Sequence, residues 1–294
     1  MPEKTLINEF VARSVRFAWL LLAVLAGAAG ATEQPGRYVE LPDVRLWIVD
    51  SGGAGEGVIL LHPRTGNADY WQYTVPALAA AGFRALAIDS PGWGRSIVRD
   101  GAEPEPVAKT IDALLDELGL QSVHVVGTAM GGYVALDFAA TYPGRTRTLV
   151  IAASGLGLEG DPEYTGFRQR ADIPAMREQP SYLREISATY RGTNPEGVAR
   201  WMAIYENSEQ EGAVRPPLAS PNTPAKLASL EMPVLVIAGG ADLVTPSHGV
   251  RLWSRHIRAP KEFIVLPEAG HVLVWEQPDV FNELLLDFLA AHRR

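Results

Sequence analysis

Cysteine is absent from this chain of 294 residues, and its absence excludes several kinds of chemistry. Without a thiol the protein has no disulfide, no thiolate zinc site and no cysteine nucleophile. The histidines and carboxylates do not fall at metal-ligand spacing on one element, and no phosphate-binding or dinucleotide glycine pattern follows a first strand. The sequence therefore predicts no metal and no cofactor.

Positive charge is scarce as well. The chain has 26 lysines and arginines against 34 acidic residues, which gives a net charge of -8. A surface with this balance repels phosphate backbones and anionic lipid headgroups. We expect no nucleic-acid partner and no stable association with a membrane surface.

Residues 1–31 differ in composition from the rest of the chain. Arg13 and Arg16 precede an apolar run over residues 17–25, and small residues follow as far as Ala31. This order is typical of a secretory signal peptide cleaved after Ala31, so we expect a periplasmic or secreted protein. An uncleaved N-terminal membrane anchor is the alternative, although the apolar run is short for a membrane span.

Short apolar runs alternate with helical patterns after this segment, which is typical of parallel strands joined by crossover helices. The expected strands are a leading hairpin at 38–41 and 45–49, then buried strands at 58–61, 85–88, 123–126, 148–152, 234–238 and 263–266. Helical spacing covers 69–81, 106–118, 130–142, 247–256 and 278–291. The sequence predicts an α/β fold with a mostly parallel central sheet flanked by helices.

One gap interrupts the alternation. About seventy-five residues separate the strand that ends near Ser154 from the strand that starts at Pro233, which is too many for a simple loop. We predict a helical lid over residues 156–231, inserted after the sixth strand into a core made of residues 32–155 and 232–294. The aromatic and arginine side chains of this lid are expected to pack and pair on the core rather than to contact substrate.

The strongest local signal is the segment 125–132, Val-Val-Gly-Thr-Ala-Met-Gly-Gly, where an apolar strand enters a glycine-flanked turn and then a helix. The segment matches a nucleophile elbow at every position except the central one, which holds Ala129. In such an elbow the central residue is strained, and the helix N-terminus points its free amides at developing negative charge.

With this motif the chain resembles the α/β-hydrolase superfamily, in its lid-bearing branch of esterases, lactonases, perhydrolases and carbon–carbon bond hydrolases. Residues 61–66 are similar to the oxyanion loop of that branch, residues 89–96 to the turn after its next strand, and Gly270-His271 with Glu276 to its histidine region. The resemblance covers nearly all of the chain after residue 31 and implies the α/β-hydrolase fold. The nucleophile serine of the branch is replaced here by Ala129.

Chain order in this fold runs nucleophile, acid, histidine, and it selects Asp242 and His271 as the other members of a triad. Each follows a predicted strand, so both are expected on loops at the sheet edge where ligands bind. His271 is the expected general base, and Asp242 is expected to fix its tautomer. Asp161, which follows the preceding strand, is the rival acid.

The resemblance also implies an oxyanion hole made of the backbone amides of Met130 and Arg64. The Arg64 guanidinium has two alternatives, because it is placed either to bind a substrate carboxylate or to face solvent and bridge to the lid. Thr128 is not expected to replace the missing hydroxyl, since strand alternation directs its side chain away from the catalytic face. His62 is expected to brace its loop.

Two functional interpretations of Ala129 follow. In the first, the protein is a serine hydrolase that cleaves an ester, a lactone or a related carbonyl substrate through an acyl-enzyme, present here in an inactivated form. In the second, it is a natural non-catalytic relative that binds a ligand in the same pocket. A binding protein has no physical need for the elbow glycines, Asp242 and His271 together, which favours the first. A further alternative is a natural variant that uses Asp242 and His271 to activate water directly. The expected partner is a small, moderately hydrophobic ester, lactone or similar carbonyl compound.

Overall fold

The computed structural model describes residues 36–293. The predicted signal peptide over residues 1–31 lies outside the described residues. Within the described range, no helix has both the length and the apolar composition that a membrane crossing requires.

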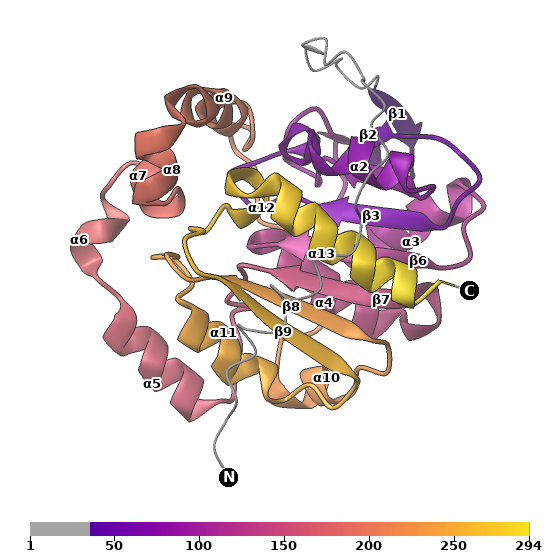
Figure 1. The fold of residues 1–294 in the computed structure, drawn as a ribbon. Coiled ribbons are helices and arrows are strands. Elements are labelled where there is room, and N and C mark those ends of the chain that lie inside the picture. Colours follow the sequence, from indigo (N-terminus) through magenta and orange to yellow (C-terminus); the bar gives the residue numbers. More distant parts are fainter. Residues whose placement is uncertain (1–35, 294) are drawn as a thin grey trace, which may run out of the picture. The chain divides into compact units, whose positions relative to one another are not determined.

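Nine strands form one central sheet. They are β1 (Gly36–Glu40), β2 (Val44–Asp50), β3 (Gly57–Leu61), β4 (Arg84–Ile88), β5 (Ile97–Val98), β6 (Val123–Thr128), β7 (Thr146–Ala152), β8 (Val234–Gly239) and β9 (Lys261–Leu266). Their order across the sheet is β1-β2-β4-β3-β6-β7-β8-β9, with β5 paired to β2 (Figure 1). The pairings of β2 with its neighbours are antiparallel, and all pairings from β4 to β9 are parallel. The predicted mostly parallel sheet is therefore confirmed.

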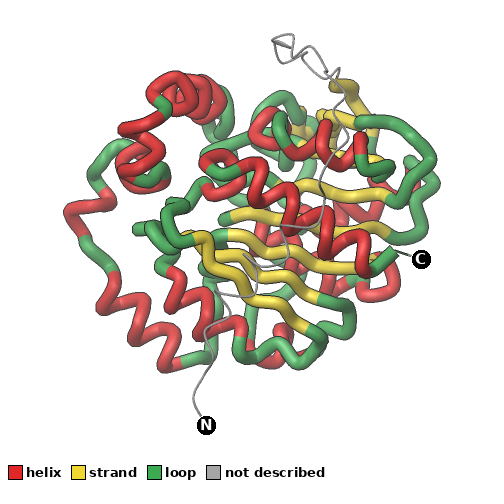
Figure 2. Tube along the Cα trace, viewed as in Figure 1, coloured by secondary structure: helices red, strands yellow, loops and turns green. Residues whose placement is uncertain are grey.

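Helices cover both faces of the sheet, as the layers in Figure 2 show. They are η1 (Ala68–Trp71), α2 (Thr74–Ala80), α3 (Val107–Glu117), α4 (Met130–Thr141), η2 (Pro143–Arg145), α11 (Ser247–Ser254), α12 (Leu273–Glu276) and α13 (Pro278–Ala291). Buried side chains of α3, α4 and α11 form one apolar core, and those of α2 and α13 form a second. Because both faces are covered, the central strands β3, β6 and β8 are buried at every position.

Two details differ from the sequence prediction. The predicted helix over 69–81 is divided into η1 and α2, and Pro76 lies in the first turn of α2, where its missing amide hydrogen does no harm. The strand β5 was not predicted, because two residues are too short to show a period. As a result, the large insertion follows β7 in the observed numbering, the strand that the sequence prediction counted as the sixth.

We refer to residues 156–231 as the insertion. It contains α5 (Pro162–Ala171), α6 (Pro174–Arg177), α7 (Ser181–Glu185), α8 (Ala188–Thr193), α9 (Pro195–Glu206) and α10 (Pro224–Ala228). Figure 1 shows α5 to α9 as a series of short helices along one side of the sheet. Four of the six helices begin at a proline, whose fixed φ suits the first helical position. Tyr164 and Trp201 of the insertion are buried in the two apolar cores.

Candidate active site

The turn between β6 and α4 holds Ala129 in a strained backbone conformation. Its φ is 49° and its ψ is -113°, a region that residues with a side chain rarely adopt. Two glycines permit the tight turn, because a Cβ on Gly127 would lie 2.2 Å from the carbonyl oxygen of Gly131, and a Cβ on Gly131 would lie 2.1 Å from that of Leu61. The backbone therefore has the geometry of a nucleophile elbow, with a methyl group at its tip.

The main chain of Ala129 is fixed by neighbouring segments. Its amide donates to the carbonyl of Ala152 at 3.0 Å, and its carbonyl accepts a hydrogen bond of 2.7 Å from the Ser154 hydroxyl. The Ser154 side chain is fully buried in this role. The Thr128 side chain is buried inside the strand as well. Both hydroxyls are therefore enclosed in the core rather than presented at the elbow.

The structure brings Asp242 and His271 together. Oδ2 of Asp242 lies 2.9 Å from Nδ1 of His271, and it also accepts a hydrogen bond of 2.6 Å from the Thr245 hydroxyl. Oδ1 of the same carboxylate accepts from the amides of Val244 and Thr245, each at 2.8 Å. The carboxylate is thus held from both sides, and a hydrogen bond at Nδ1 leaves Nε2 of His271 as the nitrogen available to a reacting group.

Burial and charge act in opposite directions on this pair. Burial alone raises the pKa of Asp242, but the charge and hydrogen bond of His271, with the hydrogen bonds from Thr245, outweigh it and hold the pKa below its usual range. Burial alone lowers the pKa of His271, but the charge and hydrogen bond of Asp242, with the charges of Glu185 and Glu276, raise it above its usual value. The imidazole is therefore a stronger base than a free histidine.

Asp161, the rival acid, is engaged elsewhere. It is the N-cap of α5, and its Oδ1 accepts from the amides of Glu163 and Tyr164 at 3.0 Å. Its Oδ2 pairs with Arg255 at 2.9 Å and with Nε2 of His256 at 2.7 Å. The structure therefore brings Asp242, and not Asp161, to His271.

The amides of Arg64 and Met130 belong to two segments in close contact. The tight approach of Gly131 to the carbonyl oxygens of Leu61 and His62 presses the start of α4 against the loop after β3. Within residues 36–293, neither amide donates a hydrogen bond to another protein group. Two free donors on adjoining segments beside the elbow are what an oxyanion hole requires.

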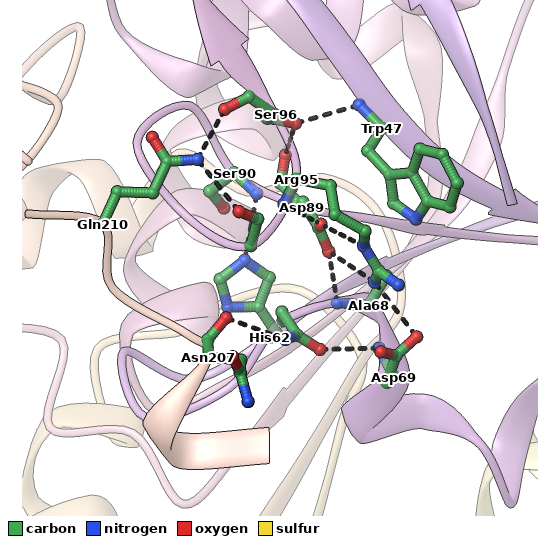
Figure 3. A network of polar contacts seen from close by, with 12 residues as sticks. Trp47, His62, Ala68, Asp69, Asp89, Ser90, Arg95, Ser96, Asn207 and Gln210 are labelled. Atoms are coloured by element: carbon green, nitrogen blue, oxygen red, sulfur yellow. Dashed lines mark hydrogen bonds and ion pairs between the residues drawn. The ribbon is translucent and has the colours of Figure 1, made fainter. Parts of the chain in front are cut away.

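Figure 3 shows the polar contacts that hold the loop after β3. Nδ1 of His62 donates to the carbonyl of Pro63 at 2.7 Å, and Nε2 accepts from the Ser90 amide at 3.0 Å. This pattern requires a neutral ring, and burial of His62 lowers its pKa accordingly. His62 braces its loop, and it occupies no position in the Asp242–His271 pair.

The buried carboxylate of Asp89 fixes the turn beside this loop. It accepts from the amides of Ala68 and Arg95, both at 2.6 Å, and pairs with the Arg95 guanidinium at 3.1 Å (Figure 3). Gln210 of the insertion donates to the carbonyls of Gly94 and Ser96 at 2.9 and 2.8 Å. The insertion is therefore hydrogen-bonded to the same turn that supports the loop after β3.

The Arg64 side chain reaches the insertion. Its guanidinium pairs with Glu209 at 2.7 Å, and the two side chains are 51% and 42% exposed. Of the two alternatives raised by the sequence, the structure has the bridge to the insertion. An exposed pair of this kind is weak, so a substrate carboxylate is able to compete for the guanidinium.

A cavity of about 340 Å³ lies apart from these residues. Its walls come from the β1–β2 turn, the loop before α3 and residues 210–214 of the insertion, and none of Ala129, Asp242 and His271 lines it. The strained elbow and the histidine–carboxylate pair, rather than the size of a cavity, define the candidate active site. In the described part of the chain no group of three or more histidine or acidic side chains is arranged to hold a metal ion.

Three residues near the pair were missed by the sequence reasoning. Thr245 follows Asp242 by three positions, a spacing typical of a carboxylate that caps its own loop. Ser154 lies two residues after the end of β7 and gave no separate signal. Glu185 lies in a short helix of the insertion, and its contact with Thr65 joins residues 120 positions apart, which no local pattern reveals.

The fold and this site define a class: a parallel sheet with a strained elbow after one strand and a histidine–carboxylate pair on later loops is the architecture of α/β hydrolases. Residues 58–284 match the model of the family described as "Alpha/beta hydrolase family". The chain belongs to this family.

Individual relatives are hydrolases. The chain is 30% identical over 266 residues to the 2-hydroxy-6-oxononadienedioate/2-hydroxy-6-oxononatrienedioate hydrolase of Paraburkholderia phymatum, covering 84% of this chain and 91% of that one. It is 30% identical over 270 residues to the 2-hydroxy-6-oxo-6-phenylhexa-2,4-dienoate hydrolase of Comamonas testosteroni, covering 82% and 90%. Among solved structures it is similar to a thermophilic esterase from Thermogutta terrifontis with malate bound, at 26% identity and a TM-score of 0.71, covering 89% and 100%.

Proposed function

We propose that this chain is a carbonyl hydrolase without its nucleophile oxygen, and that serine at position 129 makes it a working enzyme. The observation that carries the proposal is the combination of the strained elbow at Ala129 with the buried Asp242–His271 hydrogen bond of 2.9 Å. Strain at the elbow and burial of the carboxylate both cost stability, and catalysis by an elbow serine is the use that requires both.

The proposed reaction of the serine form has two halves. In acylation the hydroxyl oxygen attacks the substrate carbonyl carbon while Nε2 of His271 takes its proton, and the amides of Met130 and Arg64 donate to the developing oxyanion. The leaving group departs with the proton from His271. In deacylation His271 takes a proton from water, the resulting hydroxide attacks the acyl carbon, and the proton returns to the oxygen at position 129.

The substrate we propose is a small ester, lactone or related carbonyl compound. The relatives named above support this class, since two are hydrolases of unsaturated keto acids and one is an esterase. We further propose that the insertion acts as the lid that selects the substrate, because Arg64 and the Ser90–Ser96 turn both contact it. A substrate that carries a carboxylate fits the exposed Arg64 guanidinium.

The second candidate is a ligand-binding protein without catalysis, and Ala129 itself is the observation that favours it. A methyl group at the elbow leaves room for a carbonyl ligand and provides no nucleophile. The pocket and the amide donors then bind the ligand without turning it over.

The Ala129→Ser variant separates the two candidates. Loss of the nucleophile from a comparable triad costs about a millionfold in kcat, so restoring it is expected to raise turnover of at least one aryl ester, lactone or keto acid substrate by several orders of magnitude. The Ala129→Ser/His271→Ala double variant is the control and is expected to return to the parent rate. If a folded Ala129→Ser variant binds a panel compound and turns none over, the protein is a binding protein.

A further inference from the structure

Residue Glu185, at the end of α7, joins the insertion to the loop that carries His271. Its backbone carbonyl accepts hydrogen bonds from the amide of His271 at 2.8 Å and from the amide of Val272 at 3.3 Å. Two amides directed at one carbonyl fix the position of the histidine main chain relative to α7. The insertion therefore supports the imidazole through its backbone.

The side chain of Glu185 points to a different loop. Its Oε2 accepts a hydrogen bond of 2.7 Å from the hydroxyl of Thr65, the residue directly after Arg64. The glutamate is only 6% exposed. One residue of the insertion thus contacts both the loop of the histidine and the loop that contributes the Arg64 amide.

A second buried glutamate, Glu276, also joins the insertion to the loop of His271. Glu276 of α12 accepts from the Ser187 amide at 2.9 Å and from the Gly270 amide at 3.1 Å. Gly270 has no room for a side chain, because a Cβ there would lie 2.8 Å from the carbonyl oxygen of Glu185. The main chain at residues 185–187 is therefore packed directly against the residue before His271.

Three carboxylates act on the imidazole, each from a different element. Asp242 is on the loop after β8, Glu185 on α7 and Glu276 on α12, and the charge of each favours the protonated ring. Asp242 and its bonded Thr245 supply the direct contact at Nδ1. Glu276 accepts hydrogen bonds from main-chain amides of the insertion and of the His271 loop, and burial raises the pKa of Glu276. Glu185 is the member of this set that belongs to the insertion.

We propose that Glu185 is a positioning residue that couples the insertion to the reaction, because its backbone carbonyl holds the His271 loop and its side chain holds the Thr65 loop. The proposal rests on the proposed function and identifies how the insertion would control that site.

The charge effect is tested on the parent protein, with Ala129 in place, by following the ring resonances of His271 in an NMR titration. Glu185→Gln keeps the size and one acceptor oxygen for the Thr65 hydroxyl but removes the charge, so the titration midpoint of His271 is expected to move to lower pH. Glu196→Gln is the matched control, because it removes the same charge from an exposed position on α9 and is expected to leave the midpoint in place.

The positioning effect is tested in the Ala129→Ser background. Thr65→Val removes the hydrogen bond to Glu185 and keeps the charge, so kcat is expected to fall about tenfold while the His271 midpoint does not move. Glu185→Gln is expected to shift the acidic limb of the kcat/KM profile to lower pH by the amount seen in the titration. If Glu185→Gln does not fold, Glu185→Asp, which retracts the charge by one methylene, is expected to give a smaller shift of the same sign.

These experiments test the role of Glu185 and the proposed function separately. A His271 midpoint that is the same in Glu185→Gln and Glu196→Gln overturns the role of Glu185, whatever the activity of the Ala129→Ser variant. An inactive Ala129→Ser variant whose His271 midpoint still responds to Glu185→Gln overturns the proposed function and leaves the electrostatic coupling standing.

Discussion

The structure contains two aspartate–histidine pairs that follow adjacent strands of the sheet and are built almost alike. In each pair, Oδ1 of the aspartate accepts hydrogen bonds from the backbone amides two and three residues further along the chain. Oδ2 lies 2.9 Å from a ring nitrogen of the histidine in Asp242–His271 and 2.7 Å from one in Asp161–His256. A carboxylate that caps its own backbone and contacts a histidine is therefore not by itself a catalytic signature.

The difference lies in what else each carboxylate and each histidine contacts. Asp161 is also paired with the Arg255 guanidinium, and the side chain of His256 is 24% exposed. Asp242 has no guanidinium partner in the described range, its His271 is 7% exposed, and the contact is made through Nδ1. Because the Arg255 cation already neutralises the carboxylate of Asp161, this carboxylate acts as a structural cap. The buried carboxylate of Asp242 has only the imidazole as its counter-charge, so it is able to stabilise an imidazolium.

Substitution of the two aspartates in the Ala129→Ser background gives the largest expected difference. Asp242→Asn is expected to lower kcat by about 10⁴-fold, because the amide favours the wrong tautomer of His271. Asp161→Asn is expected to leave kcat within a few-fold. Steady-state kinetics on the best panel substrate measure both, and a similar loss in the two variants would mean that the pairs do not differ in role.

Stability is expected to respond in the opposite order. Asp161→Ala removes the N-cap of α5 and the partner of Arg255, so the free energy of unfolding is expected to fall by about 1–2 kcal/mol in a denaturant titration. Asp172→Ala is the control at the other end of α5, where an exposed ion pair with Arg177 is worth less than about 1 kcal/mol. Equal losses at the two ends would show that Asp161 does not act as a cap.

The contributions of the two pairs to the free energy of unfolding are expected to change with pH in opposite directions. Burial alone raises the pKa of Asp161, but the hydrogen bonds from His256, the Tyr164 amide and Arg255 outweigh it and lower the pKa from 3.8 to about 2. The contribution of Asp161 to the free energy of unfolding is therefore complete above pH 3.8 and is lost as the pH falls toward 2. The pKa of His271 is raised above 6.5, so its contribution is complete below that pH and is lost as the pH rises through the folded pKa.

Denaturant titrations over a range of pH check both signs. The stability difference between the parent and Asp161→Asn is expected to shrink in acid, and the difference between the parent and His271→Gln is expected to shrink in base. A difference for His271→Gln that grows with pH would contradict the raised pKa.

The smallest expected effect concerns the exposed ion pair Arg64–Glu209, which contrasts with the two aspartate–histidine pairs. Glu209→Gln frees the guanidinium, so in the Ala129→Ser background KM for a substrate with a carboxylate is expected to fall by up to about fivefold. A neutral substrate of the same shape is the control and is expected to show no change. Arg64→Gln is expected to raise KM for the carboxylate substrate, and equal effects on both substrates would remove Arg64 from substrate binding.

Much of the fold was predictable because its signals are local. Fully apolar runs marked the parallel strands, and the long gap after residue 154 marked the insertion. Asp242 and His271 could be named because chain order in this fold is informative. The partners of the site were not predictable, since Thr245, Ser154 and Glu185 act through contacts that only the packing creates. The sequence favoured Asp242 over Asp161 but did not show how Asp161 is engaged, because the Arg255 that neutralises Asp161 lies 94 residues away.

The central claim is that an oxygen at position 129 would be an activated nucleophile. Intact-mass spectrometry of the Ala129→Ser variant after treatment with a fluorophosphonate tests it most directly, because the reagent phosphonylates a serine whose proton a histidine removes, with loss of fluoride. We predict one adduct per chain, mapped to position 129, and no adduct in the parent or in the Ala129→Ser/His271→Ala variant. A folded Ala129→Ser variant that stays unlabelled, or equal labelling when His271 is absent, would contradict the account.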